Sequence, residues 1–176
     1  MKWFRSAQKD TGWLAIALGE NRLSFVHGRY APSGKSTVTR FGSAEFEPKP
    51  HAAEKLAKEL DFKRYQCATL LRAGEYQLLL VEAPAVPQAE LKSAIRWRVK
   101  DMLDYPIDDA TLDVLDIPPE SDLAGRSHSM YAVAARNEVI QARVKAFEAA
   151  RVPLSVIDIP ETAQRNLSAL HESDGR

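Results

Sequence analysis

The amino-acid sequence predicts a mixed α/β fold in which a small β-α-β-β-α subdomain is inserted into a larger unit. One observation is an opening succession of three strand-like runs, a helix and a strand, between Gly12 and Arg72, which is typical of an α/β unit with an antiparallel start. The other is a strand, a long helix, two strands and a helix between Tyr76 and Ala150. We therefore assign residues 1–74 and 152–176 to a first subdomain and residues 75–151 to an inserted one.

The first subdomain begins with a predicted β-hairpin. An apolar run over Gly12–Leu18 and an alternating run over Arg22–Tyr30 are separated by the turn signal Gly19-Glu20-Asn21. A third strand fits Ser36–Glu45, where Val38 and Phe41 are the apolar positions. The unit is completed by a helix over His51–Leu60, a strand over Gln66–Arg72, a strand over Leu154–Ile159 and a helix over Glu161–His171.

The inserted subdomain is organised around the strongest helix signal of the chain. Pro87 suits a first helical position, the run from Gln88 to Leu103 has no glycine or proline, and Tyr105-Pro106 ends it. One face of this helix is apolar, with Leu91, Ala94, Ile95, Val99 and Met102 on it and Leu103 at its margin. Strands are predicted at Tyr76–Val81, Thr111–Ile117 and His128–Ala135, followed by a helix over Glu138–Ala150 that Asn137 can cap. If the insertion is one subdomain, these three strands must share one sheet.

Composition excludes several classes of function. Lys and Arg together number 24, as do Asp and Glu, so nothing in the overall charge favours nucleic-acid binding. A single cysteine, Cys67, rules out an internal disulfide and any multi-cysteine metal site. The four histidines lack the spacing that zinc sites show. We predict no metal ion and no nucleic-acid partner.

Two stretches resemble catalytic motifs but have simpler explanations. Ser33-Gly34-Lys35-Ser36 looks like the end of a phosphate-binding loop, but the first glycine is out of place and the stretch joins two strands. We read it as a turn. The carboxylates at Asp104, Asp108, Asp109, Asp113 and Asp116 are typical of a solvated edge or turn, with cation binding or catalysis as the alternative. No serine or cysteine stands in a nucleophile-elbow context, so we predict no catalytic residues.

Two residues are out of place on the long helix. Arg98 falls inside the apolar stripe, and Trp97 lies well off it. Arg98 either packs its stem while its guanidinium reaches an edge carboxylate, or it contacts a partner chain in a groove. Trp97 either packs against the other subdomain or contacts a partner. The sequence leaves both alternatives open.

The amino-acid sequence of this helix and of the segment that follows it resembles that of a known family. The stretch Ala94-Ile95-Arg96-Trp97-Arg98-Val99-Lys100-Asp101, followed by Tyr105-Pro106-Ile107-Asp108-Asp109, resembles the inserted subdomain of PilM-type proteins. These are actin-like cytoplasmic components of type IV pilus assembly. Within this family, the sequence is most similar to the MshI branch, from mannose-sensitive haemagglutinin (MSHA) pili. The first hairpin and the ending VPLSVIDIPETAQRNL agree with the same family. The resemblance implies an actin-like, RNase H-like first lobe, with a second lobe absent after Arg176.

One departure from the family concerns nucleotide. The resemblance implies an acidic residue in the first hairpin, in a D-x-G arrangement, but this chain has Ala17-Leu18-Gly19. Gly19 and Asn21 remain as candidate phosphate contacts, because glycine lets a phosphate approach the backbone. Without the carboxylate, ATP hydrolysis is not expected and no cofactor is assigned. The lost site is similar to that of GspL, a type II secretion relative that serves as a docking scaffold.

The resemblance implies a cytoplasmic, non-enzymatic scaffold at the inner membrane. It would dock the N-terminal tail of a bitopic pilus protein of the PilN/MshJ type and couple it to the assembly ATPase. Trp97, Arg98 and Asp101 are the candidate partner-binding residues. The alternatives are an actin-like ATP-binding protein and a stand-alone ligand-sensing α/β domain. The leader Met1-Lys2-Trp3-Phe4-Arg5 is either a frayed terminus or a weak peripheral membrane contact.

Overall fold

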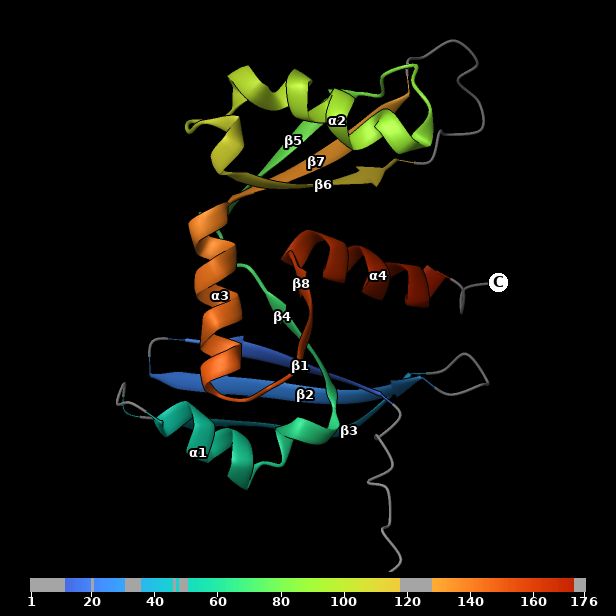
Figure 1. The fold of residues 1–176 in the computed structure, drawn as a ribbon. Helices are drawn as coiled ribbons and strands as arrows, with labels where there is room; N and C mark the ends of the chain where they lie inside the picture. Colours follow the sequence, from blue (N-terminus) through green and yellow to red (C-terminus); the bar gives the residue numbers. More distant parts are fainter. Residues whose placement is uncertain are drawn as a thin grey trace, which may run out of the picture. The chain divides into compact units, whose positions relative to one another are not determined.

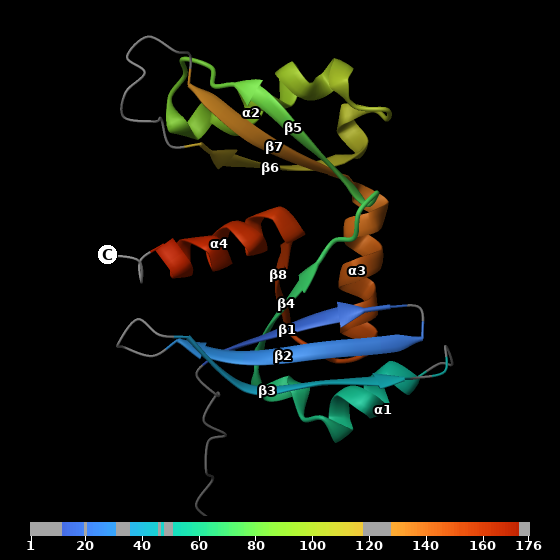
Figure 2. The same cartoon turned by 180° about the vertical axis from the view of Figure 1, so that it is seen from behind.

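The computed structural model describes residues 12–19, 21–30, 36–45, 47, 51–117 and 128–172, in two compact units (Figures 1 and 2). One unit is Met1–Leu71 with Val144–Arg176, and the other, the inserted unit, is Arg72–Arg143. The leader Met1–Arg5, Ser33–Lys35 of the stretch that resembles a phosphate-binding loop, and residues 118–127 lie outside the described residues. Among the helices that are described, none is long and apolar enough to cross a bilayer.

The larger unit is built on a five-stranded sheet of order β3-β2-β1-β4-β8. Three antiparallel strands form one side of it: β1 (Trp13–Leu18), β2 (Arg22–Tyr30) and β3 (Ser36–Glu45). The strand β4 (Gln66–Leu70) pairs parallel with β1, and β8 (Leu154–Asp158) pairs parallel with β4. The predicted α/β fold with an antiparallel start is therefore confirmed.

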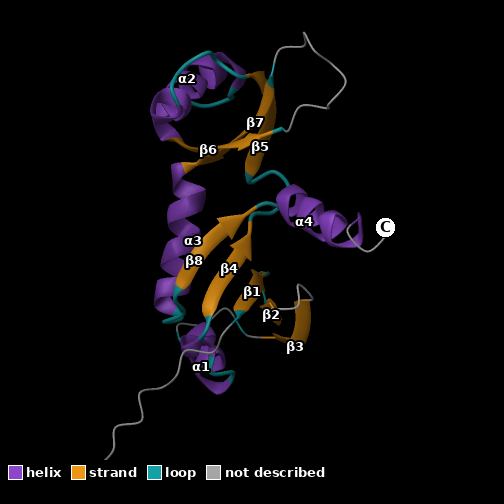
Figure 3. Ribbon diagram, turned by 90° about the vertical axis from the view of Figure 1, so that its right-hand side faces the viewer, coloured by secondary structure: helices purple, strands orange, loops and turns teal. Residues whose placement is uncertain are grey.

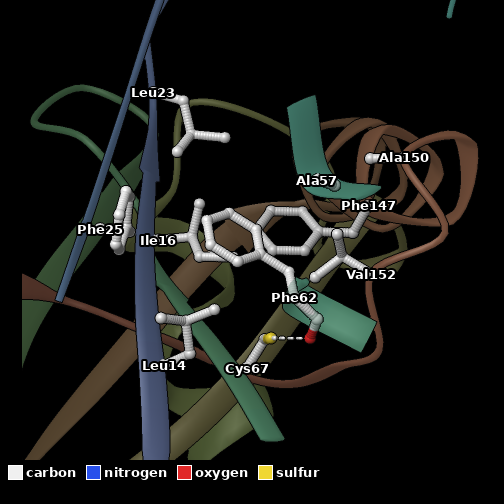
Figure 4. Close-up of a cluster of buried hydrophobic side chains, with 10 residues drawn as sticks. All are labelled: Leu14, Ile16, Leu23, Phe25, Ala57, Phe62, Cys67, Phe147, Ala150 and Val152. Carbon is white, nitrogen blue, oxygen red and sulfur yellow. Dashed lines mark hydrogen bonds between the residues drawn. The ribbon is translucent and has the colours of Figure 1, made fainter. Parts of the chain in front are cut away.

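One face of this sheet carries the core of the larger unit (Figure 4). The side chains come from alternate positions of β1 and β2, from β4, and from helix α1 (Ala52–Glu59) with the 3-10 turn Phe62–Arg64. Others come from the end of helix α3 (Asn137–Ala149) and the residues after it. The buried members are Leu14, Ile16, Leu23, Phe25, Ala57, Phe62, Cys67, Phe147, Ala150 and Val152. The Phe25 and Phe62 rings meet edge to face, with centroids 5.1 Å apart. Helix α4 (Pro160–Glu172) follows β8.

His27 is part of this packing. It is 2% exposed, its Nδ1 is 2.5 Å from Thr39 Oγ1, and its ring centroid lies 4.6 Å from that of Tyr65. The His27 ring also lies close to the backbone of Gly12, where a Cβ would stand 2.6 Å from His27 Nε2, so only glycine leaves room for the ring. These contacts give His27 a structural role in the packing of the sheet.

The inserted unit contains a three-stranded antiparallel sheet of order β5-β7-β6. Its strands are β5 (Tyr76–Glu82), β6 (Ala110–Asp116) and β7 (Ser129–Arg136), so the prediction that the three share one sheet is confirmed. Helix α2 (Gln88–Val99) packs on one face of this sheet. The packed residues are Leu91, Ile95 and Val99 on the helix and Val81, Met130 and Ala132 on the strands.

Two details differ from the sequence prediction. The α-helical geometry ends at Val99 and continues as a 3-10 turn over Lys100–Met102, so the 3.6-residue period is lost there. Met102, expected on the apolar face, is consequently 47% exposed. Helix α3 begins at Asn137 itself, and the side chain expected to cap it accepts a hydrogen bond from Thr111 (2.8 Å) and donates one to the Asp108 carbonyl (3.0 Å).

Candidate partner-binding surface

Trp97 stands on the outer side of α2, away from the packed face. Its side chain is 72% exposed, and the Lys100 ammonium lies 5.6 Å from the centre of its ring. A buried stripe of three residues fixes the helix on the sheet, so the indole is presented from a rigid element. Large aromatic residues in such positions are the type enriched at binding hot spots.

Arg98 is the next residue of α2, and its side chain extends out of the apolar stripe toward the edge of the sheet. Its guanidinium Nη1 is 3.9 Å from Glu82 Oε2, at the end of the edge strand β5. This contact with an edge carboxylate is one of the two alternatives that the sequence left open, and a contact of Arg98 with a partner chain stays a prediction. Both side chains are about half exposed, so the pair contributes little to stability. Asp101 is exposed in the 3-10 turn that follows.

Arg96 has a structural role that the sequence did not predict. Its guanidinium donates to the carbonyl oxygens of Ile107 (2.5 Å) and Ala110 (3.2 Å). It thereby holds the 3-10 turn Ile107–Asp109, which leads into β6, against the side of α2. The only signal for this role was its place beside Ile95, at the margin of the buried stripe.

The aspartates of this region are exposed and lie at turns and edges, as the simpler interpretation predicted. Asp113 on the edge strand β6 lies 2.7 Å from Lys92 Nζ on α2. Lys92 and Arg98 thus connect one helix to the two edges of the same sheet. Asp104 accepts a hydrogen bond from Gln77 at 3.0 Å and lies 3.6 Å from Arg136, and Asp116 pairs with His128.

The face of the three-stranded sheet opposite α2 is also apolar. We call it the open sheet face; the strand register places Leu78, Leu80, Leu115, Tyr131 and Val133 on it. Leu80, Tyr131 and Leu115 form one row across all three strands, with Leu80 59% and Tyr131 39% exposed. A sheet face rich in exposed leucine and tyrosine is suited to contact another apolar surface.

The candidate phosphate contacts Gly19 and Asn21 lie in the turn of the first hairpin, which is closed by a backbone hydrogen bond. The Gly19 N–H donates to the Arg22 carbonyl at 2.7 Å, so this amide is already used within the turn. A Cβ at Gly19 would stand 3.0 Å from the same oxygen, which explains the glycine there. Asn21 and Ala17 are both exposed, and Glu20 lies outside the described residues.

Comparison with known proteins identifies the family. Residues 52–173, more than half of the chain, match the family model described as "Type IV pilus assembly protein PilM". No curated protein matches. The solved PilM-PilN type IV pilus biogenesis complex is similar, with a TM-score of 0.67 and 23% identity, over 83% of this chain and 46% of that chain.

A second solved structure has the same fold. It is the cytoplasmic domain of EpsL, an inner membrane component of the type II secretion system of Vibrio cholerae, with a TM-score of 0.60 and 15% identity. The match covers 85% of this chain and 57% of that one, so the chain spans about half the length of the two solved relatives. The family match and the shared fold together establish that this chain belongs to the PilM family of type IV pilus assembly proteins.

Proposed function

We propose that this chain is a cytoplasmic, non-enzymatic scaffold of type IV pilus biogenesis, of the MSHA (MshI) kind. It docks the N-terminal tail of a bitopic inner-membrane protein of the PilN/MshJ type and links that protein to the assembly ATPase at the inner membrane. The observation that carries the proposal is the match to PilM in a complex with PilN, over 83% of this chain.

The inserted unit offers a surface suited to a short tail. A short tail buries little area, so its affinity must come from a few well-placed anchors. Trp97 and Arg98 belong to the residue types enriched at such anchors, and Asp101 lies on the following turn. Charged or aromatic groups of the tail would bind to these three side chains along the outer side of α2.

Strand β5 offers a second element to an extended tail. It is an edge strand, so its outer backbone groups can pair with an added strand. Side chains of an added strand alternate between the two faces, which would place every second one beside Leu78 and Leu80 of the open sheet face. The same strand would run past the Glu82–Arg98 pair.

A scaffold role without ATP turnover agrees with the first hairpin. Ala17 stands where the family resemblance implies a metal-organising carboxylate, and the Gly19 amide is engaged by Arg22. A phosphate would have to displace that hydrogen bond to reach the backbone there. These observations favour docking over catalysis as the role of this chain.

The test is a titration with a synthetic peptide of the first residues of a PilN/MshJ-type protein from the same organism. Binding is followed by calorimetry and by the fluorescence of the indoles, of which Trp97 is 72% exposed. We expect saturable binding, and no binding of a scrambled peptide of the same composition. Equal heats with the two peptides would contradict the proposal.

A further inference from the structure

The face of the five-stranded sheet that lies opposite its core carries a continuous apolar row. The strand register aligns one residue from each strand, in the order Val156, Ala68, Ala15, Val26 and Phe41. Sheet faces open to water usually carry polar residues. This row is apolar at every position and small at its centre.

We use the name outer sheet face for this row and its apolar neighbours on the same side of the sheet, which are Trp13, Val38 and Leu70. Phe41 is 78% exposed, Val38 60%, and Trp13 46%. The charged positions that the register places on this face lie at its ends, at the Arg22–Glu45 pair and at Asp158. An uncharged apolar area of this extent on a water-exposed sheet indicates a surface that another element covers.

Helix α4 supplies the kind of element that fits. In Figure 3, α4 leaves the end of β8 on the side of the sheet opposite α3, which is the side of the outer sheet face. Two of its apolar side chains are not fully packed: Leu167 is 60% exposed, and Ala163 is only partly buried. The chain therefore carries both an uncovered sheet face and an under-packed amphipathic helix.

We propose that a second copy of this chain covers the outer sheet face, with α4 of each copy lying on the sheet of the other. A two-fold interface requires that both halves of the contact lie on one molecule, and the sheet face and α4 meet that condition. Ala15 and Ala68 at the centre of the row let a helix approach the sheet closely. The formal net charge of +0 removes electrostatic repulsion between copies.

The first test is sedimentation equilibrium of this chain over a range of concentrations. We expect a monomer–dimer equilibrium, with Phe41→Lys and Leu167→Lys each raising the dissociation constant at least about tenfold, or roughly 1.4 kcal/mol. Met102→Lys, a matched change of an exposed apolar residue in the inserted unit, should leave the constant unchanged, since Met102 is 47% exposed and lies outside the outer sheet face and α4. Circular dichroism checks that each variant is folded. A chain that stays monomeric throughout, or dimers equally weakened by all three changes, would overturn the proposal.

A cysteine cross-link tests the arrangement within the dimer. A mixture of the Phe41→Cys and Leu167→Cys variants should form a disulfide between unlike chains, separable by a tag on one of them. The native Cys67 does not compete, because it is fully buried and burial raises the pKa of its thiol to about 11. Cross-links only between like chains would rule out the exchange of α4. Neither test involves a pilus protein, so the outcome is independent of the scaffold role.

Discussion

Glu75 and Arg143 form a 2.7 Å ion pair between residues 68 positions apart, and Arg72 shares the same carboxylate. Arg72 donates to Glu75 from its backbone N–H (2.7 Å), from Nε (3.1 Å) and from Nη2 (3.0 Å). Arg72 and Arg143 are the first and last residues of the inserted unit, so one carboxylate ties its two ends together. The Glu75 and Arg143 side chains are only 18% and 10% exposed, which shields this pair from water.

Glu75→Gln should lower the free energy of unfolding by about 1–3 kcal/mol, the usual range for hydrogen bonds to a charged group that is largely buried. Glutamine keeps the shape of the side chain but removes the charge that both arginines contact. Urea unfolding of the two proteins measures the difference. Glu59→Gln is the control, because the Glu59–Lys55 pair is 4.0 Å long and largely exposed, and its loss should cost well under about 1 kcal/mol.

The same site gives a pH dependence. Burial by itself raises the pKa of the Glu75 carboxyl, but the hydrogen bonds from Arg72 and the charges of Arg143 and Arg72 outweigh it, and the net pKa is lowered. A carboxyl with a lowered pKa in the folded state stabilises the fold above its unfolded pKa and loses this effect as the pH falls through its folded value. The Glu75→Gln difference should therefore be full at neutral pH and shrink below about pH 4. A difference that grows in acid would contradict the assignment.

Replacing Arg96 by alanine should lower the free energy of unfolding more than replacing Arg98. Arg96→Ala removes the donors to two carbonyl oxygens of the segment before β6, which should cost about 1–3 kcal/mol. Arg98→Ala removes only an exposed 3.9 Å ion pair and should cost under about 1 kcal/mol. Paired denaturant titrations decide this. Equal losses would mean that the Arg98–Glu82 contact is stronger than its geometry indicates.

Most of the fold could be predicted because the strands and helices have clear periodicity and turn chemistry. Ser36–Glu45 is a strand with the bounds that the sequence predicted, and α2 begins at Gln88 as expected. The prediction that Met102 lies on the apolar face was wrong, because it assumed 3.6 residues per turn along the whole helix, whereas the helix tightens to a 3-10 turn after Val99. A change of helix type within one turn leaves no trace in a hydrophobic pattern.

The candidate site was less predictable, because it depends on contacts between segments distant in the chain. Sequence reasoning selected Arg98 as the unusual arginine, but Arg96 makes the contacts with carbonyl oxygens 11 and 14 residues away. The Glu75–Arg143 pair was likewise missed, since only the folded chain brings the two together. The sequence left open whether Trp97 packs against the other subdomain or contacts a partner; its side chain is 72% exposed, and both alternatives stay predictions.

Nucleotide binding should be weak. The chain has Ala17 at the position of the expected carboxylate, and the Gly19 amide is engaged in the hairpin. We expect no ATP hydrolysis and no saturation with Mg-ATP in the micromolar range by calorimetry. Ala17→Asp serves as a probe, because it adds the carboxylate without freeing the amide and should not restore tight binding. A micromolar dissociation constant for the unchanged chain would reverse this view of the hairpin.

Trp97→Ala should weaken binding of the tail peptide by about 1–3 kcal/mol, and Arg98→Ala should do so within the same range. The indole is 72% exposed and the guanidinium about half exposed in the free chain, so both groups are accessible to a partner. Neither packs in the core of its unit, and thermal melts of both variants should stay close to that of the unchanged chain. Affinity is measured by calorimetry with the peptide that tests the scaffold role.

Lys92→Ala is the matched control for Arg98→Ala. Lys92 is also a cation of α2 that pairs with an edge-strand carboxylate, Asp113, but at the other edge of the sheet. If the tail binds along β5 and the outer side of α2, removing Lys92 should change its affinity by less than about 0.5 kcal/mol, the scale of long-range coupling. Equal losses in the Lys92 and Arg98 variants would indicate a general charge effect. Unchanged affinity in both the Trp97 and Arg98 variants would move the binding surface to the open sheet face, where Leu80→Ser is the next variant, since Leu80 is its most exposed leucine at 59%.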